Sequence, residues 1–373
     1  MRSFRHRPRH HPMTAVIRPP TEDPQEPAMP NALAGPKAEK TVCLALQGGG
    51  AHGAFTWGVL DAILEDGRLA IEAITGASAG AMNAVVLAEG FMEGGTEGAR
   101  GQLEAFWRRM ALGGSLSPAQ RSLFGAFLNA WSPDRLTGLP WGGLLSQLSS
   151  PYDFNPLNIN PLRDAVADLV DFDKVRACQA VKLFVAATNV FTGKIRIFEN
   201  AELTPDHVMA SACLPTVFQA VTIDGEPYWD GGYMGNPAIY PVIYGADALD
   251  VVLVQINPVE RRMVPRNAQE IQGRLNEITF NGGLLRELRA IDFVSRLVEE
   301  GRLSPADYKR LRLHRIDGEG VLDDVTAASR LTPAWSFLED LRDRGRATAK
   351  AWLASHYDAI GKSGTLDLKA AYS

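Results

Sequence analysis

The segment GASAG places Ser78 between Gly76 and Gly80 in the pattern G-x-S-x-G. An apolar run, IEAI, precedes it and an alanine-rich stretch follows it, so we expect the serine on a sharp turn from a strand into a helix. On such a turn the hydroxyl stands clear of the backbone and the N–H of Ala79 faces the same space, which suits a nucleophile beside an oxyanion hole. The simpler alternative is that Ser78 caps the helix with its side chain.

A second glycine-rich segment, GGGAHG at residues 48–53, lies between an expected strand at 41–46 and an expected helix from about residue 53. Glycines at such a junction let the backbone approach a ligand, and the helix N-terminus favours negative charge there. Because this loop and the serine turn follow adjacent parallel strands, both are expected at the carboxyl edge of one sheet. The loop therefore offers a row of N–H donors to the tetrahedral oxyanion formed at Ser78.

The same glycine loop fits the dinucleotide-binding pattern G-x-G-x-x-G, which we weigh as an alternative. That fold requires an acidic residue at the end of the second strand, and the candidate, Glu72, lies inside the expected strand instead. A phosphate loop is excluded because no Lys-Ser/Thr pair follows the glycines.

The segment DGG, Asp230 to Gly232 with Gly231 between them, supplies a candidate base for the serine. Two glycines after a carboxylate let it approach a hydroxyl without side-chain obstruction. Burial in an apolar site would raise the pKa of the aspartate and make proton transfer from Ser78 less unfavourable. A simple turn is the alternative interpretation of DGG. A Ser-His-Asp site, with His207 or His314 as the base, also remains open.

The order of apolar runs and helical stretches predicts a three-layer α/β/α fold with a mostly parallel central sheet. Strands are expected at 41–46, around IEAI, at VKLFVAATNV and at DVVLVQI, with hairpins at Thr192-Gly193 and Asp224-Gly225. A short helix is expected at TPDHVMASACLP. The chain then becomes helical and charged, with LRLHRI as a late edge strand.

Composition divides the chain into three regions. Residues 1–39 are basic and proline-rich and are expected to be a disordered tail. Residues 40–262 form the expected α/β domain, interrupted at about 111–160 by a Gly-, Ser- and Pro-rich insertion that is either a lid or acyl-chain pocket or an ordinary helical subdomain. Residues 263–373 are expected to be a mainly helical C-terminal extension.

Charge, cysteines and hydropathy limit the class of protein. The net charge is −5, which argues against nucleic acid as a partner. The three cysteines are widely spaced, so core packing is expected rather than a disulfide or a zinc site. The sequence has no apolar run long enough to cross a bilayer and no secretory signal. We expect a soluble, cytoplasmic protein for which peripheral contact with a membrane is allowed.

Taken in order, GGGAHGAF, GASAG and DGG resemble the patatin-like phospholipases over about residues 41–257, and MASACLPTVF resembles the family's segment between the serine and aspartate motifs. The resemblance implies a lipid acyl hydrolase that acts on a lipid ester through an acyl-serine intermediate and needs no metal or cofactor. Ser78 would be the nucleophile and Asp230 the proton acceptor. By the same match, the oxyanion donors would include Gly48, Gly49 and Gly50, with Gly53 as the last glycine of the loop. His52 departs from the family, which more often has Arg or Lys there.

Two further alternatives come from outside this enzyme class. A lipid-binding or regulatory module could keep the fold without catalysis, although an intact Ser78 and Asp230 argue against it. A nicotinamide-dependent enzyme is the weakest alternative, because a dinucleotide site has no use for a serine turn on its second strand.

Overall fold

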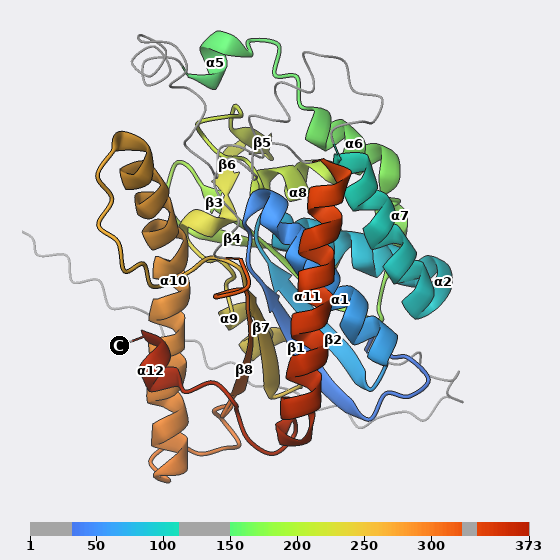
Figure 1. Cartoon of the computed structure of the whole chain (residues 1–373), viewed down its shortest axis with the longest axis vertical. Helices are drawn as coiled ribbons and strands as arrows, with labels where there is room; N and C mark the ends of the chain where they lie inside the picture. The colour runs from blue at the N-terminus through green and yellow to red at the C-terminus, as the bar shows by residue number, and fades with distance from the viewer. Residues whose placement is uncertain (1–31, 112–149, 323–333, 373) are drawn as a thin grey trace, which may run out of the picture.

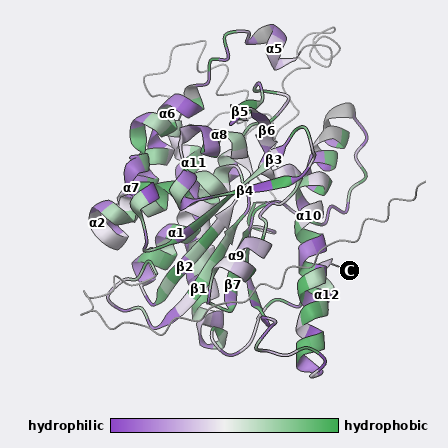
Figure 2. Cartoon of the chain, turned by 180° about the vertical axis from the view of Figure 1, so that it is seen from behind, coloured by the Kyte–Doolittle hydropathy of each residue, from purple (hydrophilic) through white to green (hydrophobic). Residues whose placement is uncertain are grey.

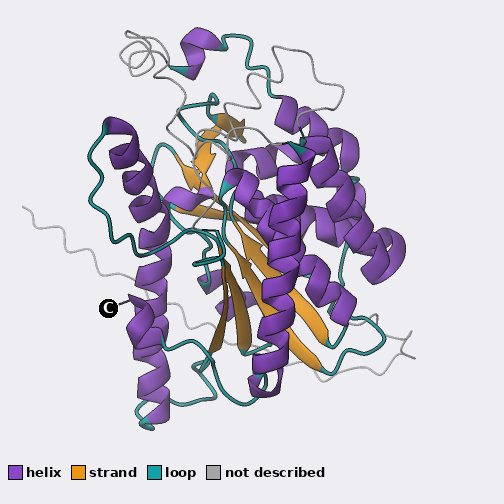
Figure 3. Cartoon of the chain, in the orientation of Figure 1, coloured by secondary structure: helices purple, strands orange, loops and turns teal. Residues whose placement is uncertain are grey.

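The computed structural model describes residues 32–111, 150–322 and 334–372, and its centre is an eight-stranded sheet (Figures 1 and 3). The strands follow the order β5-β6-β3-β2-β1-β7-β8, and β4 also pairs with β3. Their bounds are β1 Lys40–Leu46, β2 Leu69–Gly76, β3 Lys182–Asn189, β4 Ile195–Glu199, β5 Val221–Ile223, β6 Glu226–Asp230, β7 Asp250–Gln255 and β8 Arg312–Asp317. The run from β3 through β2, β1 and β7 to β8 is parallel, as the sequence predicted.

Helices cover both faces of the sheet. Their bounds are α1 Gly53–Asp66, α2 Ala79–Met110, α5 Pro151–Phe154, α6 Pro161–Leu169, α7 Phe172–Ala177, α8 Pro205–Ser211, α9 Tyr240–Gly245, α10 Ala268–Glu299, α11 Trp335–His356 and α12 Leu368–Tyr372. Helices α1, α2 and α11 pack on one face, and α9, α10 and α12 on the other. This arrangement is the three-layer α/β/α fold expected from the sequence.

The two faces of the sheet follow from alternation along each strand. In β1, Leu44 and Leu46 face the core beneath α1 and α2, whereas Cys43 and Ala45 face the core beneath α9 and α10. The central strands are mostly apolar on both faces, because helices shield both of their sides from water (Figure 2). All three cysteines are buried and free, as expected for core packing.

The C-terminal part of the chain is integrated into this core. Helix α11 lies directly on α1, and the two approach so closely that a side chain could not be accommodated on either of two glycines. A Cβ at Gly58 would overlap the carbonyl of Arg342, and one at Gly345 would overlap the carbonyl of Phe55. Strand β8 forms the edge of the sheet, as LRLHRI predicted.

The predicted tail boundary at residue 39 is wrong. Leu33 is buried and exchanges two backbone hydrogen bonds of 2.8 Å with Ile71 of β2, because an apolar side chain there completes the core above the sheet. Residues 1–31 of the expected tail and 112–149 of the expected insertion lie outside the described residues. Within the described ranges, no helix combines the length and apolarity needed to span a bilayer.

Candidate active site

Ser78 occupies a strained turn between β2 and α2. Its backbone has φ 54° and ψ −124°, a conformation that costs a non-glycine residue about 1–3 kcal/mol. Gly76 and Gly80 make the turn feasible. A Cβ at Gly76 would lie 2.7 Å from the carbonyl carbon of Gly80, and one at Gly80 would overlap the carbonyl oxygen of Leu46. The Ser78 side chain makes no capping hydrogen bond, so the alternative role as a helix cap is wrong.

The glycine loop packs against this turn. A Cβ at Gly48 would lie 2.7 Å from the Cβ of Ser78, so only glycine lets the loop come so close. A Cβ at Gly49 would meet the end of the Ile256 side chain, which would have to shift, and Gly50 adopts φ 59°, in the left-handed region. A Cβ at Gly53 would lie 2.7 Å from the Cβ of Ala79, which brings the first turn of α1 against the first turn of α2.

Asp230 ends β6 and is held from three sides. Its N–H donates to the carbonyl of Cys213 at 2.8 Å, and its own carbonyl accepts from the Thr188 hydroxyl at 2.8 Å. Its Oδ1 accepts from the N–H of Gly232 at 2.7 Å. A Cβ at Gly231 would overlap the carbonyl of Ala186, so the chain after the aspartate must be glycine. Burial raises the pKa of Asp230 to about 7, against the partial opposition of the Gly232 N–H and the Ser78 hydroxyl.

Sheet register brings the serine and the aspartate together. Strand β4 occupies one side of β3, so β2 and β6 must lie along its other side, and they run toward each other. The last residue of β2, Gly76, pairs with Val185, and the last residue of β6, Asp230, pairs with Ala187. The two strand ends are therefore about 7 Å apart along β3.

The Ser78 hydroxyl and the Asp230 carboxylate face each other across this gap without a well-aligned hydrogen bond. The hydroxyl is close enough to lower the pKa of Asp230. Both side chains are 0 % exposed, and among the described residues no partner is within hydrogen-bonding geometry of Ser78 Oγ or Asp230 Oδ2. Two adjacent buried polar atoms without a hydrogen-bond partner are unusual outside functional sites.

The end of α8 and the residues that follow it hold the backbones of both Ser78 and Asp230. The N–H of Ser78 donates to the backbone carbonyl of Ser211 at 3.1 Å and to its hydroxyl oxygen at 3.0 Å. Two residues later, the carbonyl of Cys213 holds the N–H of Asp230. These residues belong to MASACLP, so the segment noted for its resemblance alone is a bridge between the two motifs.

Four buried amides that the sequence analysis missed hold the glycine loop. Asn236 Oδ1 accepts from the N–H of Gly48 at 2.6 Å, and Asn257 Nδ2 donates to the carbonyl of Gly48 at 2.6 Å. Gln47 links both to α10, because its Nε2 donates to Asn281 Oδ1 at 3.0 Å and its Oε1 accepts from the Asn257 N–H at 2.9 Å. The N–H of Gly48 is thus already committed, which corrects its expected role as an oxyanion donor.

The two histidines considered as bases are engaged elsewhere. His207 Nδ1 lies 2.8 Å from the Thr204 hydroxyl, and burial lowers the pKa of this histidine. His314 lies between Asp250 and Thr365, 3.0 Å from each. Asp250 is the first residue of β7. It precedes by four residues, or roughly 13 Å, the position in β7 that pairs with the end of β1 at the carboxyl edge, where Ser78 lies.

The acid required by the dinucleotide alternative is also engaged. The carboxylate of Glu72 accepts from the N–H groups of Asp247 and Ala248 at 2.8 Å and pairs with Lys182 at 3.0 Å. It fastens the loop before β7 and does not reach the glycine loop. In the described ranges, no three His, Cys, Asp or Glu side chains gather as metal ligands.

A serine on a strained turn between a strand and a helix, beside a glycine-rich loop, is typical of α/β serine hydrolases. The sequence model of the patatin-like phospholipases matches residues 44–243, more than half of the chain. The chain belongs to the patatin-like phospholipase family and is a lipid esterase of that family. No curated protein matches the chain.

Solved structures also match, at low similarity. VipD from Legionella pneumophila is 15 % identical with a TM-score of 0.39, and the match covers 86 % of this chain and 68 % of VipD. ExoU from the type III secretion system of Pseudomonas aeruginosa, in complex with SpcU, is 18 % identical with a TM-score of 0.28, over 69 % of this chain and 59 % of ExoU. A second ExoU structure is 16 % identical with a TM-score of 0.33, over 85 % and 53 %. The match spans little more than half of the length of ExoU.

Proposed function

We propose that the chain hydrolyses lipid esters with Ser78 as the nucleophile and Asp230 as its base. The observation that carries this proposal is the pair of buried, unpartnered atoms, Ser78 Oγ and Asp230 Oδ2, at the meeting point of β2 and β6. The raised pKa of Asp230 supports it, because a carboxylate with a pKa of about 7 is a far better base than an ordinary aspartate.

The reaction proceeds in two balanced halves. Ser78 Oγ attacks the ester carbonyl carbon while its proton passes to Asp230 Oδ2, and the tetrahedral intermediate collapses when that proton is returned to the departing alcohol. Water then gives a proton to Asp230 and attacks the acyl-serine. Collapse of this second intermediate releases the fatty acid and returns the proton to Ser78.

The oxyanion donors in this proposal are the N–H groups of Gly49, Gly50 and Ala79. Gly48 positions the loop, since Asn236 accepts its N–H. Ala79 is the first residue of α2, so its N–H has no acceptor within the helix. Loss of one such donor typically lowers turnover about a hundredfold to a thousandfold.

Hydrolysis of p-nitrophenyl butyrate and labelling by a fluorophosphonate test the proposal. We expect Ser78→Ala to abolish labelling and to lower turnover at least about a thousandfold. Asp230→Asn should lower both, because no base remains to take the serine proton. The roles assigned here are wrong if Asp230→Asn turns over at the wild-type rate, or if labelling persists in Ser78→Ala. An inactive wild type would favour the non-catalytic lipid-binding alternative.

A further inference from the structure

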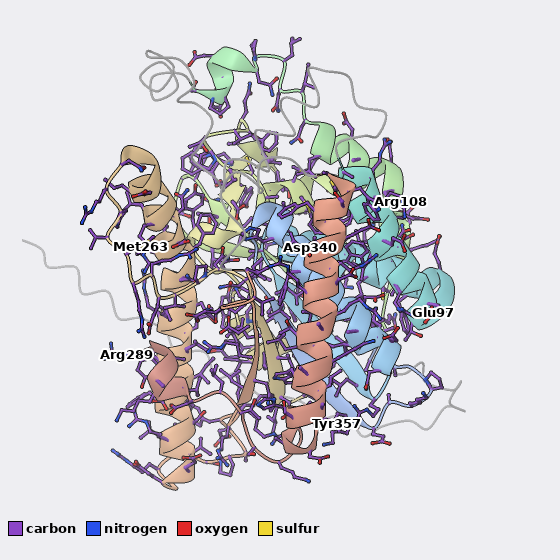
Figure 4. All side chains as sticks on the ribbon, in the orientation of Figure 1. Glu97, Arg108, Met263, Arg289, Asp340 and Tyr357 are labelled. Atoms are coloured by element: carbon purple, nitrogen blue, oxygen red, sulfur yellow. The ribbon has the colours of Figure 1, made fainter. Side chains whose placement is uncertain are left out.

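The loop between β7 and α10 carries two strongly exposed apolar side chains in an arginine-rich segment. Met263 and Val264 are 85 % and 81 % exposed, in the sequence RRMVPR at residues 261–266 (Figure 4). Exposed apolar side chains are ordinary when scattered, but five of the thirteen large ones among the described residues fall within residues 263–278. The cluster therefore needs an explanation.

The base of this loop is fixed to the site. Asn257 contacts Gly48, and the carbonyl of the next residue, Pro258, accepts from Asn281 of α10 at 3.0 Å. Arg274 Nη2 donates to the carbonyl of Val259 at 2.8 Å. Arg261 pairs with Glu277 at 3.0 Å. A loop held at both sides of its base presents its tip, residues 262–266, in a defined place.

The first half of α10 continues the apolar surface. Ile271, Leu275 and Ile278 are 45 %, 51 % and 53 % exposed, and at about 100° per residue they fall within about 60° of one another on the helix. This stripe borders the side of α10 that holds the loop. Phe280, on the opposite, buried side of the same part of α10, packs against Gly232, so this half of the helix lies beside the aspartate motif.

The charge of this surface is opposite to that of the whole protein. Residues 260–277 contain four arginines and three glutamates, a net charge of +1, on a chain of −5. At the base, Glu277 pairs with both Arg261 and Arg274. At the tip, Glu260 lies 4.0 Å from Arg262, and the Glu270 carboxylate accepts from the backbone N–H of Arg266, so the guanidinium groups of Arg262 and Arg266 are the ones left to meet a ligand. Arg262, with its side chain 93 % exposed, and Arg266 flank the two apolar side chains at the tip.

We propose that residues 261–278 are a docking surface for an anionic lipid bilayer, in which Met263 and Val264 enter the interface and Arg262 and Arg266 contact lipid phosphates. Apolar side chains surrounded by arginines suit the boundary between headgroups and acyl chains. The inference rests on the proposed function, since a lipid ester must pass from a bilayer to Ser78. Membrane docking at this surface would explain why the loop that carries it begins at the carboxyl edge of the sheet, next to the glycine loop.

The test uses the full chain with Ser78→Ala, which leaves vesicles intact, and measures co-sedimentation with vesicles. We expect binding to equimolar phosphatidylcholine and phosphatidylglycerol that is much stronger than binding to phosphatidylcholine alone. Met263→Asp with Val264→Asp should lower the partition coefficient at least about tenfold, through lost apolar burial and the added negative charge. Arg262→Gln with Arg266→Gln should lower it about thirtyfold, at about fivefold for each arginine.

Tyr244→Asp is the matched control, because Tyr244 on α9 is also 85 % exposed, and it should bind vesicles as the parent chain does. Thermal unfolding shows whether each variant is folded. The docking proposal is overturned if the parent chain co-sediments with neither kind of vesicle. It is also overturned if the folded Met263→Asp/Val264→Asp variant binds vesicles as strongly as the parent chain. It is also overturned if light scattering shows a dimer that this variant dissociates. Turnover of p-nitrophenyl butyrate by the wild type reports the proposed chemistry separately.

Discussion

Replacing Asp230 with asparagine should inactivate the protein and, above neutral pH, stabilise it. The carboxyl is fully buried, and burial raises its pKa from 3.8 to about 7. In the unfolded chain the same group loses its proton near its ordinary pKa. Between these two values the folded protein binds one more proton than the unfolded chain, so this group makes the free energy of unfolding fall as pH rises.

The size of this change in the free energy of unfolding follows from the difference between the folded and unfolded pKa values. Each pKa unit corresponds to about 1.4 kcal/mol, so between about pH 5 and pH 7 the wild type loses roughly 3 kcal/mol through this one group. Above the folded pKa both states are ionised and the loss is complete. Asparagine has the same shape, can keep the hydrogen bond from Gly232 and does not titrate. The stability of Asp230→Asn relative to wild type should therefore increase by roughly 3 kcal/mol from about pH 5 to pH 8.

Urea unfolding of both proteins across this pH range, followed by tryptophan fluorescence, measures the difference directly. All other titrating groups are shared and largely cancel. Asp307→Asn, the same change on an exposed side chain, is the control. A stability difference between Asp230→Asn and wild type that does not vary with pH would refute the reasoning, because the carboxylate would then not be desolvated in the folded state.

Further measurements test other parts of the site. Turnover of a soluble ester should rise with pH to a plateau, with an apparent pKa of about 7, because Asp230 must be ionised to accept the serine proton; a profile flat from about pH 5 to pH 8 would contradict this. Asn236→Ala should lower kcat about tenfold to a hundredfold with little change in KM, since the Gly48 peptide loses its partner; steady-state kinetics decide, and a rise in KM alone would count against it. His207→Ala should keep kcat within about threefold, because its ring is bonded to Thr204; a large loss would restore the Ser-His-Asp alternative. Gly345→Ala should lower Tm by several degrees through overlap with Phe55, whereas Gly101→Ala, in open space on α2, should stabilise by up to about 1 kcal/mol.

The local geometry of the two glycine motifs was readable from the sequence. A strand followed by G-x-S-x-G and a helix leaves few conformations for the serine, and the structure accounts for Gly76 and Gly80 by backbone contacts that no Cβ could share. The central strands were also predictable, because short apolar runs between turn residues have few alternatives. Asp224 and Gly225 likewise have the positive φ angles that the predicted tight hairpin requires.

The long-range parts of the site were not readable. The ends of β6 and β2 meet because both strands pair with the same side of β3. No pattern in the sequence predicts which side of β3 a strand will pair with. The amides Gln47, Asn236 and Asn257 are far apart in sequence and have no common spacing. The only signal was the position of Gln47, since an amide at the end of a buried strand must find hydrogen-bond partners.

The family match ends at residue 243, but the folded unit does not. Strand β7, which pairs with Cys43–Leu46 of β1, lies beyond that limit, as does α11, which covers α1. A fragment cut at residue 243 would bare an unpaired strand edge and a wide apolar surface directly beneath the glycine loop, and such edges recruit other chains. A truncated chain that keeps only the family-matched region should therefore aggregate. The role of the C-terminal residues is better tested by point substitutions in the full chain.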